Sequence, residues 1–306
     1  MSFLIRCALF LGLLSVSIVQ ADDLELVKVA KDVYALVGPI TNRTPENLGN
    51  NATFGFVVTN EGVVLIDSGG SFLGAQKIHQ AIKKVTDKPI QYVINSGGQD
   101  HRWFGNSYFS AQGATIISSK AARADHQNRL VDQIGRLTAL IGDEQFKGTE
   151  EKYADILFET DYELTLGGVK FELHNAGQAH TPGDIYIWLA DRSVMFSGDI
   201  VFVERMLGVG EQSNSKSWVQ VFESMAAYKP QHVVPGHGHP VSLAGAEKDT
   251  YAYLLALRDK VSAFMEEGGD ASDIADVDFS EFNYLSNFDT LAGRNALKVY
   301  TELEWE

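Results

Sequence analysis

Residues 90–101 read IQYVINSGGQDH, an apolar run followed by small and polar residues and then an Asp-His pair. The same order recurs at residues 194–199, VMFSGD, and at residues 232–237, HVVPGH. Small residues between a strand and a polar group are typical of a rigid sheet that presents side chains at one edge. We therefore expect one shared site. Its candidate residues are Asp100, His101, His180, Asp199 and His237.

Strand and helix patterns alternate through the rest of the chain. Between residues 72 and 85, apolar side chains recur at helical spacing, and Ser118 or Ser119 is suited to cap a second long helix. The predicted strands cover residues 54–59, 63–66, 90–94, 114–117, 162–173, 185–189, 194–196 and 232–234, and further helices cover 217–228, 251–265 and 291–303. Two β-rich units, each followed by helices, predict an α/β fold in which sheet packs on sheet with helices outside.

The composition limits the classes of partner. The chain has 306 residues, of which 45% are hydrophobic, so it can bury a sizeable core. With 25 Lys and Arg against 40 Asp and Glu, the formal net charge is −15. Such an acidic protein is a poor partner for nucleic acid or an anionic membrane. We expect a small-molecule substrate.

The first residues have the pattern of a secretory signal. Arg6 precedes an apolar stretch over residues 7–19, and residues 19–21, VQA, offer small side chains for cleavage. We expect a signal peptide over residues 1–21, one mature domain over residues 22–306, and a periplasmic or secreted location; an uncleaved anchor is the alternative. Cys7 is the only cysteine. The mature chain would therefore contain neither a disulfide nor a thiolate ligand.

Histidine and aspartate are common zinc ligands. A bound zinc lowers the pKa of its water to about 7, which supplies hydroxide at neutral pH without a Ser or Cys nucleophile. The same ligand types also suit iron and manganese. The candidate residues thus favour a metal-dependent hydrolase.

These motifs, in this order, resemble the metallo-β-lactamase superfamily over essentially all of the mature sequence. The family's H-x-H-x-D-H pattern falls on residues 96–101, SGGQDH, and its third motif falls on residues 179–184, AHTPGD. A strand ending at Asp67 matches as well. The resemblance implies a four-layer αββα sandwich. Residues 97–106 and 204–210 are more narrowly similar to the periplasmic glyoxalase II-like and SoxH-like (quinoprotein relay) zinc hydrolases.

One departure from the family pattern is important. Ser96 and Gly98 stand where the family has the two histidines of H-x-H. By resemblance, the first metal site keeps only His180 and Asp199. The second site is complete, and its ligands by resemblance are Asp100, His101, Asp199 and His237. We predict one tightly bound Zn²⁺; a weak second metal held by His180 with substrate or water is an alternative.

The remaining polar residues have competing interpretations. Asp100 is expected to orient the nucleophile, and His180 is expected to bind substrate or to act as a general acid. Arg102 and Trp103 either shape the pocket and hold an anionic group, or pack at a helix start. Asp184 is expected either to support the fold or to orient a metal ligand. Gln99 is a candidate hydrogen-bond donor that could fill part of the emptied first site.

We therefore predict a secreted zinc-dependent hydrolase in which metal-bound hydroxide attacks an ester, thioester or lactam carbonyl. Hydrolysis of β-lactams is one alternative. A second alternative, favoured by the lost H-x-H pair, is a non-catalytic metal-binding accessory protein of a periplasmic redox pathway.

Overall fold

The computed structural model describes residues 24–306. The predicted signal peptide, residues 1–21, lies outside the described residues, so its cleavage and the location of the protein stay predictions. Among the described residues, no helix combines the length and the apolar character that a membrane span requires.

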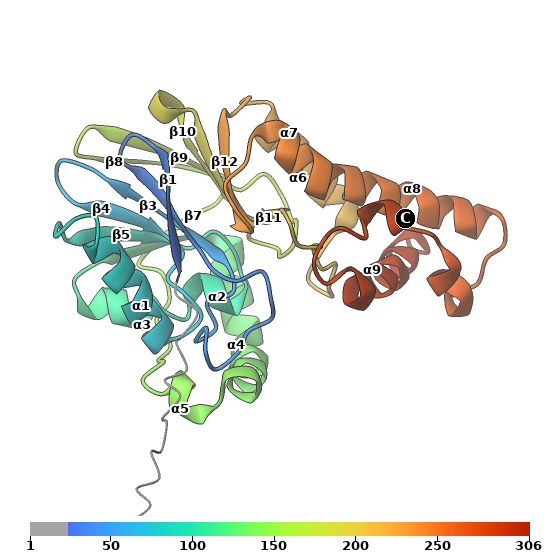
Figure 1. Cartoon of the computed structure of the whole chain (residues 1–306), viewed down its shortest axis with the longest axis horizontal. Helices are drawn as coiled ribbons and strands as arrows, with labels where there is room; N and C mark the ends of the chain where they lie inside the picture. Colours follow the sequence, from blue (N-terminus) through green and yellow to red (C-terminus); the bar gives the residue numbers. More distant parts are fainter. Residues whose placement is uncertain (1–23) are drawn as a thin grey trace, which may run out of the picture.

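Two β-sheets stack against each other (Figure 1). The first has the strand order β1-β2-β3-β4-β5-β6-β7, and the second has the order β12-β11-β10-β9-β8. The first sheet consists of β1 (Glu25–Ala30), β2 (Val33–Val37), β3 (Thr53–Val58), β4 (Val63–Ile66), β5 (Ile90–Ile94), β6 (Thr115–Ser119) and β7 (Ile156–Phe158). The second consists of β8 (Asp161–Leu166), β9 (Val169–His174), β10 (Tyr186–Leu189), β11 (Val194–Phe202) and β12 (His232–His237).

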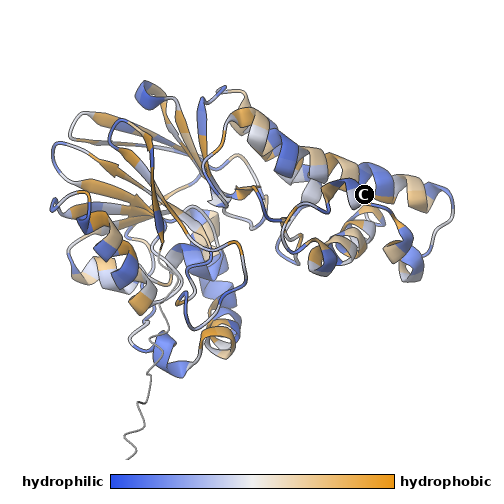
Figure 2. Cartoon of the chain, in the orientation of Figure 1, coloured by the Kyte–Doolittle hydropathy of each residue, from blue (hydrophilic) through white to orange (hydrophobic). Residues whose placement is uncertain are grey.

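The sheets are held together by an apolar layer that both contribute to, including Val64 and Ile94 from the first and Phe171 and Phe196 from the second. Gly55 of β3 permits this close approach, because a Cβ there would lie 2.2 Å from the Phe196 ring. Figure 2 shows hydrophobic residues concentrated on the strands of the two stacked sheets. Burial of apolar surface between the sheets is the main stabilising term for such a sandwich.

Helices cover the two outer faces. On the first sheet lie α1 (Phe72–Lys83), α2 (Asp100–Trp103), α3 (Asn106–Ala111), α4 (Lys120–Ile141) and α5 (Asp143–Phe146), and on the second lie α6 (Ser215–Ala226) and α7 (Leu243–Ala246). Helix α8 (Ala252–Glu266) packs on α6, and α9 (Phe288–Leu303) packs on α8. The 3₁₀ helices are η1 (Ala190–Arg192), η3 (Ala271–Asp276) and η4 (Ser280–Phe282), and η2 (Glu247–Tyr251) is a π-helix. Helices α8 and α9 extend away from the sheets (Figure 1). The predicted αββα class is confirmed.

Local details differ from the sequence-based prediction at the candidate site. Ser119 is the residue that caps α4, because its side chain accepts a hydrogen bond from the Ala122 amide. The strand predicted to end at Phe196 continues to Phe202, so Asp199 lies inside β11 and not in a following loop. Gly198, with φ +51°, breaks the pairing register with β12 just before Asp199. This irregularity turns the aspartate toward the site although the strand continues.

Candidate metal centre

Three of the predicted ligands converge. One ligand atom from each of His101, Asp199 and His237 lies within 4.8 Å of the others, and all three residues are buried. They come from α2, from β11 and from the end of β12. The carboxylate lies between the two rings, with Oδ2 3.2 Å from His101 Nε2 and Oδ1 3.3 Å from His237 Nε2. Two imidazoles and one carboxylate fit zinc and other divalent transition metals.

The His237 ring is fixed by its surroundings. Its Nδ1 donates a hydrogen bond to the Asn51 carbonyl at 2.9 Å, which directs Nε2 toward Asp199. The ring stacks on Phe202, with centroids 4.7 Å apart. Burial lowers the pKa of His237 well below its usual range, against an opposing hydrogen bond to Asp199. The ring is therefore neutral, which is the form that binds metals.

Arg102 holds Asp199 from the other side. Its fully buried guanidinium donates to Asp199 Oδ1 at 2.6 Å and Oδ2 at 3.1 Å, and to Asp67 Oδ2 at 2.8 Å. Burial raises the pKa of Asp199, but attraction to Arg102 and contacts with the neighbouring histidines outweigh it and hold that pKa well below its usual range. Arg102 has no access to solvent, so the interpretation that it holds an anionic substrate is wrong. Arg102 instead binds the carboxylates of Asp67 and Asp199, which lie far from it in the sequence.

Asp100 lies outside the converging group. It begins α2, and its carboxylate contacts the Arg43 guanidinium and accepts a hydrogen bond from the His101 amide at 2.7 Å. Arg43 also contacts His101 Nδ1. Burial raises the pKa of Asp100, but the charge of Arg43 and the contacts with His101 and Arg43 together outweigh this effect, so the pKa is lowered. Arg43 belongs to the loop between β2 and β3, and no local sequence pattern indicated its role.

The region of the lost H-x-H pair is filled by other groups. The Ser96 hydroxyl donates to Asp67 Oδ2 at 2.7 Å. A Cβ at Gly98 would lie 1.9 Å from Asp125 Oδ2, and Asp125 is paired with Arg129 on α4. The volume that a histidine at position 98 would need is therefore taken by an ion pair.

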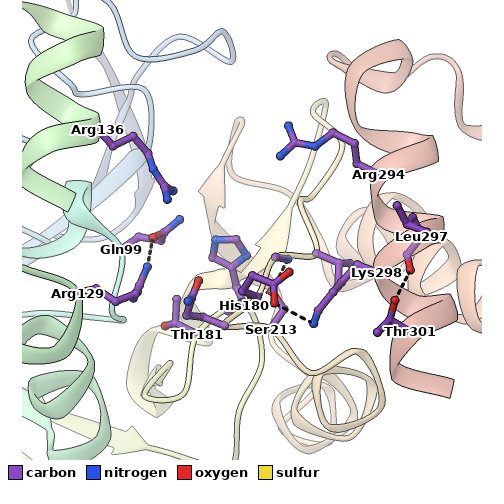
Figure 3. A pocket seen from close by; sticks show the side chains of 14 residues that line it. Gln99, Arg129, Arg136, His180, Thr181, Ser213, Arg294, Leu297, Lys298 and Thr301 are labelled. Carbon is purple, nitrogen blue, oxygen red and sulfur yellow. Dashed lines mark hydrogen bonds and ion pairs between the residues drawn. The ribbon is translucent and has the colours of Figure 1, made fainter. Parts of the chain in front are cut away.

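His180 is half-buried and lies outside the converging group. Its Nδ1 donates to the Gly208 carbonyl at 3.0 Å, and its ring faces a pocket of about 470 Å³ (Figure 3). Burial lowers its pKa to about 4, with Asp199 opposing and His101 adding to the shift. The ring is thus neutral at pH 7. His180 lines this pocket, whereas the three converging ligands are not among its lining residues.

Asp184 and Gln99, two further candidate residues from the sequence, form hydrogen bonds with neighbouring groups. Asp184 is buried, accepts the Thr181 amide at 2.7 Å and contacts the Thr181 hydroxyl, which fixes the turn that carries His180. Burial and the charge of Asp199 raise the pKa of Asp184 to about 8. Gln99 accepts a hydrogen bond from Arg129 at 3.1 Å. It lines the same pocket as His180.

The family model of the metallo-β-lactamase superfamily matches residues 49–237. The chain belongs to this superfamily. Metallo-β-lactamase IND-1 of Chryseobacterium indologenes is 23% identical over 186 residues, which cover 60% of this chain and 70% of that protein. The linear primary-alkylsulfatase of a Pseudomonas strain is 23% identical over 252 residues, 68% of this chain and 46% of that enzyme. The chain therefore spans about half of the alkylsulfatase.

Solved structures agree with this membership at the level of fold. A metallo-β-lactamase from Pontibacter korlensis has a TM-score of 0.62 at 20% identity and covers 76% of this chain and 99% of its own. The sec-alkylsulfatase Pisa1 from Pseudomonas sp. has a TM-score of 0.69 at 18% identity and covers 91% of this chain and 50% of its own. The narrower similarity to glyoxalase II-like and SoxH-like proteins stays a prediction.

Proposed function

We propose that this superfamily member is an exported hydrolase that cleaves an ester, thioester or lactam carbonyl with one tightly bound Zn²⁺. The observation that carries the proposal is the convergence of His101, Asp199 and His237 at buried positions. His180, the remaining candidate histidine, lines a pocket of about 470 Å³. When bound, a divalent metal supplies Lewis acidity and lowers the pKa of a coordinated water. The three side chains would hold it.

Other residues of the chain orient the metal ligands and supply polar groups for the substrate. Arg102 and Asn51 orient Asp199 and His237, so the ligand atoms are set before a metal binds. Asp100, next to His101, is the group suited to orient the nucleophile once Arg43 releases it. Because Nδ1 of His180 donates to Gly208, its neutral Nε2 is an acceptor that can hydrogen-bond substrate or bind a weak second metal.

The test compares two histidines of the same short segment. We expect His237→Ala to lower the metal content, measured by mass spectrometry, from about one ion per chain to near zero, because a tetrahedral site loses a protein ligand. His239→Ala is the matched control, since His239 is exposed and pairs with Glu25 and Glu204. Equal metal content and equal hydrolysis in both variants would contradict the proposal.

β-Lactams are one substrate class within this proposal. Metallo-β-lactamases of Chryseobacterium indologenes and Elizabethkingia meningoseptica are both 23% identical to matched parts of this chain. A panel of nitrocefin, p-nitrophenyl acetate, a glutathione thioester and an alkyl sulfate separates the candidate bonds. Absence of nitrocefin turnover at high enzyme concentration would exclude β-lactams as substrates.

A non-catalytic metal-binding role is the second candidate. The observation that favours it is the contact of Arg43 with Asp100, together with the ion pair that fills the first site. Tight metal binding without turnover of any bond in the panel would support this role and exclude the hydrolase.

A further inference from the structure

The pocket beside His180 has two walls from distant parts of the chain. Helix α4 contributes Arg129 and Arg136, and α9 contributes Arg294 and Lys298. Figure 3 shows Arg136 and Arg294 on opposite sides of the opening, with His180 between the two helices. At about 470 Å³, the pocket has the size of a small-molecule site.

The charge of this pocket is opposite to that of the protein. Four cationic side chains line it against one carboxylate, Glu211, in a chain whose formal net charge is −15. Lys298 lies 3.6 Å from Glu211, and Arg129 pairs with Asp125. Within residues 24–306, the side chains of Arg136 and Arg294 have no hydrogen-bond or ion-pair partner. Two guanidiniums are thus available at the opening.

The same pocket also exposes apolar surface. Leu297, one helical turn from Arg294, has 46% of its surface exposed, and Val209 lines the pocket from the loop after β11. A ligand that matches both features has a negatively charged group and a hydrocarbon part. Inorganic anions match only the first feature.

We propose that this pocket binds a small organic anion between α4 and α9, with Arg136 and Arg294 as specificity-determining residues that contact its charged group. Guanidinium groups bind carboxylates, sulfates and phosphates through paired hydrogen bonds. Leu297 contacts the hydrocarbon part, and His180 lies at the inner end. That this anion is the substrate rests on the proposed hydrolase function; the binding itself does not.

Calorimetric titration with butane-1-sulfonate tests the binding, because this anion has no bond that the hydrolase would cleave and its sulfonate is a weak metal ligand. We expect Arg136→Ala and Arg294→Ala each to raise the Kd about three- to tenfold, and the double variant to raise it further. Arg294→Lys should recover part of the affinity. Higher salt should weaken binding of the wild type.

Lys147→Ala is the matched control, since it removes one exposed positive charge outside the pocket lining. The proposal is overturned if Lys147→Ala weakens binding as much as the two arginine variants, or if 1-pentanol binds as well as the sulfonate. The His237→Ala chain separates the two proposals. Retained sulfonate binding with lost hydrolysis supports both, whereas unchanged hydrolysis contradicts only the proposed metal-dependent function.

Discussion

Arg102 binds both carboxylate oxygens of Asp199, at 2.6 Å through Nη2 and at 3.1 Å through Nε, and all of these atoms are buried. The same guanidinium reaches Asp67 on the first sheet at 2.8 Å. One side chain therefore links Asp67, which follows β4 of the first sheet, to Asp199 inside β11 of the second. It fixes the orientation of the aspartate that the two site histidines face.

Removal of this guanidinium should destabilise the fold. We expect Arg102→Ala to lower the free energy of unfolding by about 3–5 kcal/mol, because two buried carboxylates lose their cation. Arg102→Lys keeps the charge but loses the planar fork, so it should recover only part of the loss. Chemical denaturation measures both variants. Arg136→Ala, an exposed arginine, is the control and should change the stability by less than about 0.5 kcal/mol. Equal stability of Arg102→Ala and wild type would refute the link.

Arg43 should compete with a metal for Asp100. Its guanidinium contacts both the Asp100 carboxylate and His101 Nδ1. We expect Arg43→Ala to tighten zinc binding by about tenfold, because the freed carboxylate can join the ligands without first breaking an ion pair. Competition with a chromophoric chelator measures the affinity. Arg192→Ala controls for the general loss of positive charge. A weaker zinc affinity in Arg43→Ala would show that this arginine supports the site.

Restoring the family's H-x-H sequence should not restore a first metal site. In Ser96→His/Gly98→His, the new side chain at position 98 meets the Asp125 carboxylate. We expect the metal content to stay near one ion per chain and the stability to fall by about 1–3 kcal/mol, because the space is already filled. Gly135→His on the exposed face of α4, where a Cβ meets no atom within 4 Å, is the matched control. A second bound metal in the double variant would contradict this account.

His126 should make the protein less stable in acid. It is buried against Trp103, its Nε2 donates to the Gly97 carbonyl at 3.0 Å, and burial lowers its pKa to about 3. The unfolded chain binds a proton at this histidine near pH 6.5 and the folded chain does not. This stability contribution is therefore present above pH 6.5 and decreases as the pH falls toward 3, by about 2 kcal/mol between pH 7 and pH 5.

The measurement is a comparison of urea unfolding at pH 7 and pH 5 with the His126→Phe variant, which keeps a ring against Trp103. We expect the difference between the two pH values to be smaller in the variant by about 2 kcal/mol. An identical pH dependence in both proteins would show that His126 does not carry this proton linkage.

The order of elements was predictable because it depends on local pattern. Two short apolar runs predicted β3 and β4, and helical spacing predicted α1. Of the two cap candidates, Ser118 and Ser119, the latter begins α4. The short helices α3, α5 and α7 were not predicted, and α2 was expected only in one interpretation of Arg102 and Trp103. None exceeds six residues. Helices of that length depend on tertiary contacts more than on propensity.

The sequence by itself determined that small residues and then His101, Asp199 and His237 follow apolar runs, and hence that these three side chains would share one site. Only the tertiary structure decided what surrounds them. Arg43 meets Asp100 across 57 residues, and Arg102 meets Asp199 across 97. A charge pair over such separations leaves no periodic signal in the chain, because its energy depends on distance in space and on burial. The stacking of sheet on sheet with helices outside follows from local hydrophobic pattern, whereas the electrostatics of the site follow from how the layers pack.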